Sequence, residues 1–495
     1  MRLAIGMLGV LLALCGERAG AEEAWKPPVR WRGFNLLGMF TFRGQPGDFP
    51  EEDFKLISEL GFNFVRVPMD YRFWIKNGDW EQIDESRLAP VDAAVALGKK
   101  YRLHVQLCFH RAPGYTVAKP PEARNLFADE DALRVCCKHW AFFAKRYRGI
   151  RSDELSFNLF TEPGEVTEAD YGRVGEALVR AIRAEDPRRF IVADGIAWGG
   201  RPCQSLFGLG IGQAMRGYRP MSISHYRASW VGNPTGEPVW PPSPAVSPLY
   251  GKAKAPLNVP LVIENVPAGT LVLQPAVVSG SVRLRAEADG AQVGEWELVP
   301  RDGPGWTNVS YKTEWKIWQG QCLSELRAEM PAGARRLTVG VSSGDWAGLS
   351  RLLVKGRDGR TAALTFEQAW GRTNGVFQFA GFAVNPPFRL AGGGSDWTGI
   401  GYLRKEALSP WQPAFDAGVF VQVGEFGAYQ YTPHAITLAW MEDNLRLWKE
   451  KNLGWALWNF RGSFGVLDSG RSDVAYEAFS GHKLDRKMLE LLQKY

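Results

Sequence analysis

Two glutamates, each at the end of an apolar strand-like run, are the residues of this chain best suited to chemistry. Glu162 closes the run LSFNLFTEP, and Glu425 closes the run VFVQVGEFG. A carboxylate at the end of a buried strand is costly to desolvate, which favours a chemical reason for its presence. Hydrolysis of a glycosidic bond uses a protonated acid and, in retaining enzymes, an ionised carboxylate ~5 Å away. The pair therefore predicts a glycosidase whose two carboxyl groups differ in pKa.

Four further residues lie at or near the ends of similar runs. Arg66 is an internal charge in FNFVRVPM, and a guanidinium beside Glu425 would favour the ionised carboxylate of a nucleophile. His110 and His225 could bind sugar hydroxyls or orient a carboxylate as neutral imidazoles. Trp458 in WALWNF could form the floor under the cleaved sugar. A structural ion pair, two core histidines and a core tryptophan remain the alternatives for these residues.

Short strand-like runs alternate along the chain with helix-length amphipathic stretches, which predicts an α/β fold. Similar distances separate these runs, except for one long interval between the sixth and the seventh. Eight alternating units predict a (β/α)8 TIM barrel, with functional residues at the carboxyl ends of its strands. The runs begin near Arg30, Phe62, His104, Leu155, Phe190, Met221, Val419 and Gly454.

The long interval has a different sequence texture, and we expect it to be an inserted domain. Segments such as TLVLQPAVV and RRLTVGVSS alternate apolar and polar residues between Gly, Pro or Asp turns. This pattern predicts an all-β jelly-roll-like sandwich at residues 232–394, inserted between barrel segments 22–231 and 395–495. Pro-rich stretches on both sides suit semi-rigid linkers.

The predicted insertion follows the sixth strand, from a loop on the functional face, so we expect the sandwich to stand beside the mouth of the site. A carbohydrate-binding role and a simple spacer role both remain open. Tryptophans that could form a binding surface are Trp306, Trp315, Trp318 and Trp346.

The first 21 residues have the pattern of a signal peptide. Arg2 precedes an apolar stretch that ends at Leu14, and Ala19-Gly20-Ala21 forms an A-x-A cleavage site. The apolar stretch is too short to span a bilayer, which disfavours a membrane anchor. We therefore expect a secreted or periplasmic protein without stable membrane insertion, and a lipoprotein attached at Cys15 is the alternative.

The composition of the chain excludes several classes of function. The net charge of +6 is small for 495 residues and the basic residues are scattered, so we expect no nucleic-acid partner. The cysteines lack the spacing of metal ligands and suit core positions, so we expect neither a metal nor another cofactor. The 20 tryptophans suit a protein that binds a polysaccharide or oligosaccharide, because flat aromatic faces match sugar rings. We expect the protein to be a monomer.

Several motifs together resemble glycoside hydrolase family 5, the cellulase family. They are RGFN at 32–35, GFNFVRVP at 61–68, HRAPGY at 110–115, the EP pair at 162–163, GEFG at 424–427 and WALWNFRGSFGVLDSGR at 455–471. The resemblance implies that Glu162 is the acid/base and Glu425 the nucleophile, with Arg66 beside it. It also implies that His110 is a subsite ligand and Trp458 a stacking platform. A member of this family retains the anomeric configuration and needs no metal.

The chain departs from that family at two places. Thr161 precedes the acid/base where the family usually has an Asn that holds the sugar 2-hydroxyl. The family's His-x-Tyr motif after strand six is represented by His225-Tyr226-Arg227, which leaves the role of Tyr226 open. Both departures affect recognition of the sugar at the cleaved bond.

The sequence therefore predicts a secreted, retaining glycoside hydrolase that cleaves β-glycosidic bonds in a polysaccharide or its oligosaccharides. Glucan or mannan is the substrate that the resemblance implies. An exo-acting glycosidase, including a furanosidase, is the alternative within the enzyme class. A non-catalytic carbohydrate-binding protein is the alternative from another class.

Overall fold

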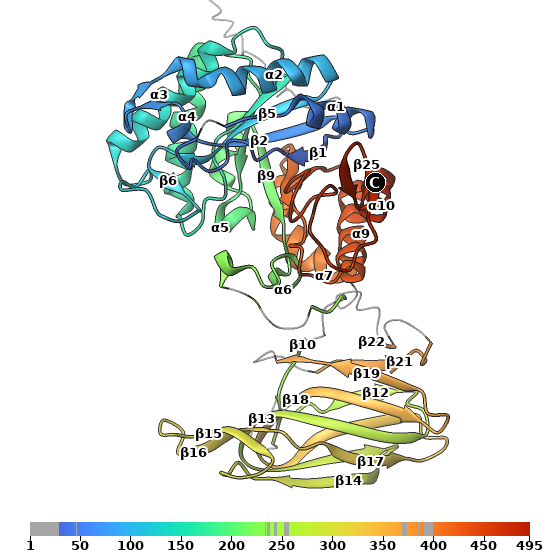
Figure 1. Cartoon of the computed structure of the whole chain (residues 1–495). Coiled ribbons are helices and arrows are strands. Elements are labelled where there is room, and N and C mark those ends of the chain that lie inside the picture. The colour runs from blue at the N-terminus through green and yellow to red at the C-terminus, as the bar shows by residue number, and fades with distance from the viewer. Residues whose placement is uncertain are drawn as a thin grey trace, which may run out of the picture.

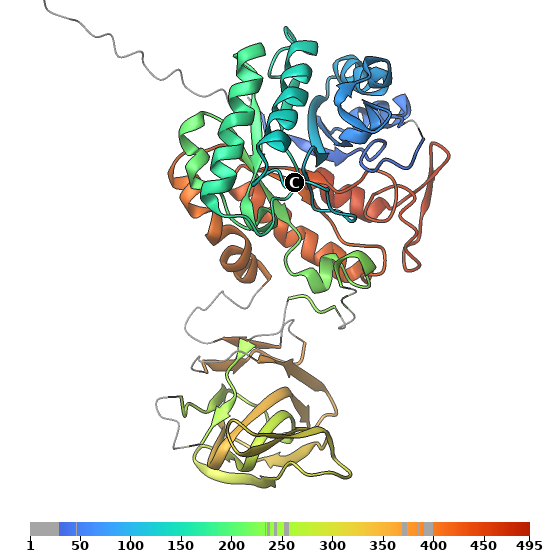
Figure 2. The ribbon, with the colours of Figure 1, turned by 90° about the vertical axis from the view of Figure 1, so that its left-hand side faces the viewer.

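A computed structural model describes residues 29–45, 47–232, 234, 238–241, 245–251, 257–368, 374–383, 387–390 and 399–495. The helices and the strands of a barrel gather in one body, and the strands from β10 to β22 form a second (Figures 1 and 2). The signal peptide expected at residues 1–21 lies outside the described residues.

The first body is a closed barrel of parallel strands. Their order around the barrel is β2-β1-β24-β23-β9-β8-β7-β5, and pairing between β2 and β5 closes the ring. This arrangement confirms the predicted TIM barrel. The strands are β1 (Arg32–Asn35), β2 (Phe64–Asp70), β5 (His104–Ala112), β7 (Leu155–Asn158), β8 (Ile191–Asp194), β9 (Gly212–Gly217), β23 (Val421–Phe426) and β24 (Gly454–Leu457).

Amphipathic helices cover the outside of the barrel and bury their apolar faces against it. The sequence sets where two of them begin: the side chains of Asp129 and Thr167 accept hydrogen bonds from first-turn amides of α3 and α4. None of the helices in the described ranges is both long and apolar enough to cross a membrane. The principal helices are α1 (Glu51–Glu59), α2 (Ala89–Tyr101), α3 (Glu130–Arg146), α4 (Glu168–Glu185), α9 (His434–Glu450) and α10 (Arg486–Lys494).

Shorter elements complete this body around the barrel. They are β3 (Ile75–Lys76), β4 (Asp79–Ile83), β6 (Tyr115–Thr116), α5 (Ile196–Gly199), α6 (Met221–Ser224), α7 (Gly399–Leu403), α8 (Gln412–Asp416), β25 (Glu477–Phe479) and β26 (His482–Leu484).

The prediction of the sixth strand at Met221 was wrong. That strand is β9 (Gly212–Gly217), and Met221–Ser224 is the short helix α6, which begins directly after Pro220. The segment MSISHY imitates a strand because its apolar and polar residues alternate. The real strand, GQAMRG, contains two glycines and an arginine and has no β-branched residue, so its β-signal is weak. With the sixth strand at Gly212–Gly217, Arg216 and Tyr218 lie at its carboxyl end.

The second body consists mostly of antiparallel strands around its own apolar core. Two long strands, β13 (Gly269–Ala288) and β18 (Arg336–Gly356), pair along most of their lengths. The domain limits 232–394 remain a prediction. The other strands are β10 (Ala245–Val246), β11 (Leu249–Tyr250), β12 (Leu261–Glu264), β14 (Ala291–Leu298), β15 (Trp306–Lys312), β16 (Ile317–Cys322), β17 (Leu326–Met330), β19 (Thr361–Thr365), β20 (Glu367–Gln368), β21 (Val376–Phe379) and β22 (Phe388–Leu390).

Candidate active site

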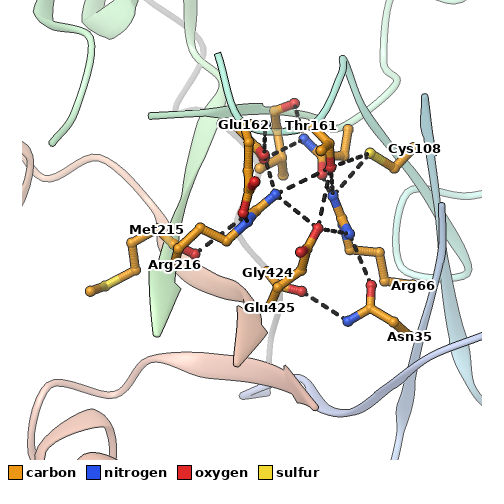
Figure 3. A network of polar contacts seen from close by, with 12 residues as sticks. Asn35, Arg66, Cys108, Thr161, Glu162, Met215, Arg216, Gly424 and Glu425 are labelled. Atoms are coloured by element: carbon orange, nitrogen blue, oxygen red, sulfur yellow. Dashed lines mark hydrogen bonds and ion pairs between the residues drawn. The ribbon is translucent and has the colours of Figure 1, made fainter. Parts of the chain in front are cut away.

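Glu425 lies near the carboxyl end of β23 and is buried at the centre of a polar network (Figure 3). Its Oε1 accepts hydrogen bonds from Arg66 at 2.7 Å, from Arg216 at 3.0 Å and from the Thr161 hydroxyl at 3.2 Å. Its Oε2 accepts a longer bond from the Tyr218 hydroxyl at 3.4 Å. Every one of these partners donates, which is the arrangement that an ionised carboxylate requires.

The surroundings of Glu425 keep its carboxyl group charged. Burial by itself would raise its pKa, but Arg216, Arg66 and His110 together hold the pKa below its ordinary value. At neutral pH this side chain is a carboxylate that two guanidinium groups orient.

Glu162 follows β7 and has a left-handed backbone, with φ at 51°. This conformation is unfavourable for a residue with a side chain, so its neighbours must hold it. Its amide donates to Oδ2 of Asp194 at 2.8 Å, and its carbonyl accepts from the Tyr115 hydroxyl at 2.6 Å. The side chain accepts from Nε of Arg216 at 2.9 Å and keeps 16% of its surface exposed. The backbone of Glu162 is therefore fixed while its carboxyl group stays accessible.

The carboxyl group of Glu162 has the opposite protonation tendency to that of Glu425. Burial, followed by the negative charge of Glu425, raises the pKa of Glu162 to about 7, although Arg216 opposes the shift. One carboxyl is thus held ionised, and a second is held protonated in weakly acidic solution. Such a separation assigns different acid–base tasks to neighbouring carboxyl groups.

Arg66 on β2 is fully buried and its guanidinium is saturated with hydrogen bonds. Besides Glu425, it donates to the side-chain carbonyls of Asn35 at 2.9 Å and Asn158 at 3.0 Å. It also donates to Thr161 at 2.8 Å and approaches the sulfur of Cys108 at 3.0 Å. Partners on several strands therefore fix the guanidinium against Glu425.

Thr161 is fully buried inside this network (Figure 3). Its hydroxyl accepts from Arg66 at 2.8 Å and from Arg216 at 3.3 Å, and it donates to Glu425 at 3.2 Å. A hydroxyl has one hydrogen to donate, and here Glu425 receives it. The geometry favours a role in orienting Glu425 over the sugar contact expected from the sequence.

His110 and Trp458 lie together beside the network. Their rings are 5.8 Å apart, and each packs against Phe40. Burial lowers the pKa of His110 to about 4, so the imidazole is neutral near pH 7, and its Nδ1 has no hydrogen-bond partner among the described residues. Trp458 is half-buried. An unpaired imidazole nitrogen next to a partly exposed indole is suited to a sugar hydroxyl and a sugar face.

His225 lies near the site, whereas the Tyr226 ring packs against a neighbouring arginine. The His225 ring packs against Tyr218 with centroids 4.8 Å apart, and its Nδ1 is 2.8 Å from the Ser224 hydroxyl. Burial lowers the pKa of His225 to about 4. The ring of Tyr226 instead packs against the guanidinium of Arg227, whose Cζ lies 5.0 Å from the centroid of the tyrosine ring. Tyr218 is the tyrosine that contacts Glu425.

Among the residues next to the two glutamates, the sequence analysis did not single out Asp194, Arg216 and Tyr218. Asp194 closes the run FIVADG, which the analysis identified as a strand without singling out its acidic end. Arg216 and Tyr218 were missed because the sixth strand was placed too late. With the sixth strand at Gly212–Gly217, Arg216-Gly217-Tyr218 occupies the position where the resemblance implies a His-x-Tyr motif.

No group of three or more His, Cys, Asp or Glu in the described ranges could hold a metal ion. The five cysteines of those ranges are free, and four of them are buried. Burial raises the pKa of Cys108 to about 12, which keeps its thiol protonated beside Arg66. The chemistry of the network therefore rests on carboxyl, guanidinium, hydroxyl and imidazole groups.

Residues 23–208 match the family model described as Cellulase (glycosyl hydrolase family 5). The first part of the barrel is therefore similar to glycosyl hydrolase family 5. A structure described as a glycoside hydrolase matches at a TM-score of 0.59 and 26% identity, over 94% of this chain and 99% of the other. A family 5 endoglucanase from Thermotoga maritima matches at a TM-score of 0.50 and 16% identity, over 93% and 96%, which shows the shared fold alone.

Two curated relatives match shorter parts of the barrel. Endoglucanase C of Acetivibrio thermocellus is 31% identical over 145 residues, which are 29% of this chain and 42% of that protein. Cellodextrinase A of Ruminococcus flavefaciens is 24% identical over 213 residues, 40% of this chain and 61% of that protein. The chain thus spans less than half the length of the endoglucanase.

Proposed function

We propose that this chain is a retaining glycoside hydrolase that cleaves β-glycosidic bonds of a glucan-type polysaccharide or its oligosaccharides. One observation carries the proposal: a single guanidinium, that of Arg216, contacts two carboxyl groups whose pKa values move in opposite directions. The names of the relatives, endoglucanase and cellodextrinase, support a β-glucan as the substrate.

The proposed reaction proceeds by two displacements. In the first, a Glu425 oxygen bonds to the anomeric carbon while Glu162 gives its proton to the departing glycosidic oxygen. In the second, ionised Glu162 takes a proton from water, the water oxygen bonds to the anomeric carbon, and the bond to Glu425 breaks. Glu425 ends as a carboxylate and Glu162 as an acid, so the enzyme returns to its initial state.

The retaining course is supported by the sharing of Arg216. Nε and one terminal nitrogen of a guanidinium form a fork, so their acceptors lie only a few ångströms apart. Retaining enzymes separate their carboxyl groups by ~5–5.5 Å, whereas inverting enzymes leave ~6.5–9.5 Å for a water molecule. A contact through one guanidinium fits the shorter spacing.

Recognition of the sugar is assigned to the groups around the two carboxyls. We propose that Trp458 supports the sugar face, and that His110 and His225 bind hydroxyl groups as neutral imidazoles. Arg66, Thr161 and Tyr218 orient Glu425. We do not include Tyr226 among the proposed substrate-binding residues, because its ring packs on Arg227.

Azide rescue tests the two catalytic assignments. Glu425→Ala should lose turnover, and azide with an activated aryl glycoside should then give a glycosyl azide of inverted configuration. Glu162→Ala should retain slow turnover of the same activated glycoside, and azide should give a product of retained configuration. Wild-type protein that hydrolyses neither aryl β-glycosides nor β-glucans would favour the carbohydrate-binding alternative.

Endo and exo action can be separated by the products from one polymer. An endo-acting enzyme lowers the viscosity of a soluble β-1,4-glucan early, whereas an exo-acting enzyme releases short sugars with little change in viscosity. Activity on short glycosides together with none on polymers would support the exo-acting alternative, and a pentofuranoside substrate in the same panel tests the furanosidase reading.

We also propose that the protein is exported, since residues 1–21 have the pattern of a signal peptide. Sequencing the amino terminus of protein recovered outside the cytoplasm would test this. A mature chain that begins near Glu22 is expected, and a retained leader would contradict the proposal.

A substrate-recruiting role for the second body is supported by three exposed aromatic residues on the hairpin of β15 and β16. Tyr311, Trp315 and Trp318 are 47%, 61% and 50% exposed, and Tyr311 lies directly opposite Trp318 with ring centroids 5.4 Å apart. Exposed aromatic faces of this kind suit a sugar chain. Trp306 and Trp346, which the sequence analysis grouped with them, are more buried.

A further inference from the structure

Arg216 enters the site through a space that two glycines leave open. A Cβ atom at Gly424 would lie 2.7 Å from Nη1 of Arg216, and one at Gly199 would lie 2.7 Å from its Cγ. Gly199 also has a left-handed φ of 71°, a conformation that favours glycine. The backbone next to Glu425 and the short helix α5 after β8 are therefore shaped around this side chain.

Asp194 is the fixed counter-charge of Arg216. It is fully buried, it forms a close ion pair with Nη2 of Arg216, and its other oxygen accepts from the side-chain amide of Asn158 at 3.0 Å. The amide of Glu162 donates to it as well. All these partners are donors, so Asp194 is placed as a carboxylate. It has no exposed surface through which it could touch substrate.

The charges of the buried cluster balance only when one carboxyl is protonated. Arg66 and Arg216 contribute two positive charges, and Asp194 and Glu425 contribute two negative ones. An ionised Glu162 would add a third negative charge, which a buried site disfavours. The titratable groups of the cluster and those packed against it are Arg66 on β2, Cys108 and His110 on β5, Tyr115 on β6, Tyr171 on α4, Asp194 on β8, Arg216 and Tyr218 at the end of β9, His225 after α6 and Glu425 on β23.

The remaining groups of that set carry no charge near pH 7. Burial lowers the pKa of His110 and of His225 to about 4 and raises that of Cys108 to about 12. It likewise raises the pKa values of Tyr115, Tyr171 and Tyr218 above the ordinary tyrosine range. The balance thus rests on two arginines and three carboxyl groups.

We propose that Asp194, acting through Arg216, is a positioning residue that sets the charge balance of the cluster, so that Glu162 is protonated before glycosyl transfer and ionised after it. This inference rests on the proposed function of Glu162 and Glu425. When Glu425 forms an ester it loses its charge, and two arginines then face Asp194 alone. The cluster then becomes neutral when Glu162 gives up its proton to the leaving group.

The first test replaces Asp194 by Asn and follows the alkaline limb of kcat/KM on an aryl β-glycoside. Without the Asp194 charge the cluster balances with Glu162 ionised, so the limb should move to lower pH by ~1 unit or more. The double variant Asn158→Asp with Asp194→Asn moves the carboxylate to the neighbouring position and should bring the limb back. A limb that stays in place in the single variant would overturn the proposal.

A matched control is the buried pair of Asp186 and Arg189, which lies before the amino end of β8, away from the site. Arg189 donates to Asp186 at 2.8 Å and to three backbone carbonyls. Asp186→Asn should lower the melting temperature without moving the limb. If Asp194→Asn does not fold, Arg216→Met with Asp194→Asn removes both charges and should keep the limb near its wild-type position; a shift of ~1 unit in that variant would count against the proposal.

A readout that does not need turnover separates this inference from the proposed function. Protein labelled with ¹³C at the glutamate carboxyls can be titrated by NMR, and the signal missing in Glu162→Gln identifies Glu162. The Glu162 signal should titrate at lower pH in Asp194→Asn than in wild type. If the wild type hydrolyses no glycoside but Asp194→Asn lowers the titration pH of Glu162, the proposed function is refuted and the charge-balance inference stands. If the wild type hydrolyses glycosides but Asp194→Asn does not change the titration of Glu162, the charge-balance inference is refuted and the proposed function stands.

Discussion

The Thr161 hydroxyl donates to Oε1 of Glu425 at 3.2 Å, the same oxygen that receives Arg66 and Arg216. Three donors on one oxygen leave Oε2 as the less encumbered atom, with only the 3.4 Å contact from Tyr218. This asymmetry assigns Oε2 to the attack on the sugar and Oε1 to anchoring. Removing a hydrogen-bond donor from either oxygen of Glu425 should therefore change the rate of catalysis.

Thr161→Val should lower kcat by ~10–100-fold with little change in KM, because it removes a hydrogen bond to a charged group and keeps the side-chain volume. Steady-state kinetics on an aryl glycoside checks this. Thr437→Val is the control, since Thr437 is equally buried and accepts from Arg471, away from the site. An increase in KM at unchanged kcat would instead support the sugar contact that the sequence suggested.

Tyr218→Phe should lower kcat by about tenfold, since the hydroxyl that donates to Oε2 of Glu425 is lost. Tyr226→Phe should leave kcat unchanged because that ring packs on Arg227. Kinetics of the two variants side by side decide which tyrosine serves the site. A larger loss in Tyr226→Phe would restore the sequence-based assignment.

The pH dependence of kcat/KM should be bell-shaped with an alkaline limb near pH 7. Glu162 must be protonated to act as the acid, and its pKa is raised to about 7, so activity falls as pH rises through that value. Glu425 must be ionised, and its lowered pKa places the acidic limb below the ordinary glutamate range. Activity that keeps rising to pH 9 would contradict the assignment of the acid.

Glu162→Gln should stabilise the folded protein above pH 7 but not near pH 4. The pKa of Glu162 is higher in the folded state than its ordinary value of 4.5, so wild-type stability is lost as pH rises from about 4.5 to about 7. Because glutamine does not titrate, the variant should not lose the free energy of unfolding, on the order of 1–3 kcal/mol, that the wild type loses over this pH range. Urea unfolding at pH 4 and pH 8 measures the difference. Glu165→Gln, on an exposed side chain, should show no such dependence.

Trp315→Ala with Trp318→Ala should weaken retention of the protein on insoluble β-glucan and leave kcat on a soluble aryl glycoside unchanged. The pair removes two exposed aromatic faces from the β15–β16 hairpin, which lies in the body separate from the barrel (Figure 1). Trp296→Ala, at a more buried position on strand β14 of the same body, is the control. Equal retention of wild type and double variant would leave the second body with a spacer role.

The barrel could be predicted from the sequence because seven of its strands are apolar runs at regular intervals. The sixth could not, since GQAMRG has no apolar alternation and its arginine resembles a surface residue until its three carboxylate partners are known. The same error hid Arg216 and Tyr218 and directed attention to Tyr226. Asp194 was hidden for another reason: a lone acidic residue at the end of a strand gives no sign that the fold buries it.

The glycines at 199 and 424 have a consequence for redesign of the site. They leave room for a long, flat side chain at position 216, and a shorter residue there would leave a void lined by carboxyl groups. Water would enter such a polar void and weaken every charge interaction within it. The residues at positions 199, 216 and 424 should therefore be substituted together or not at all.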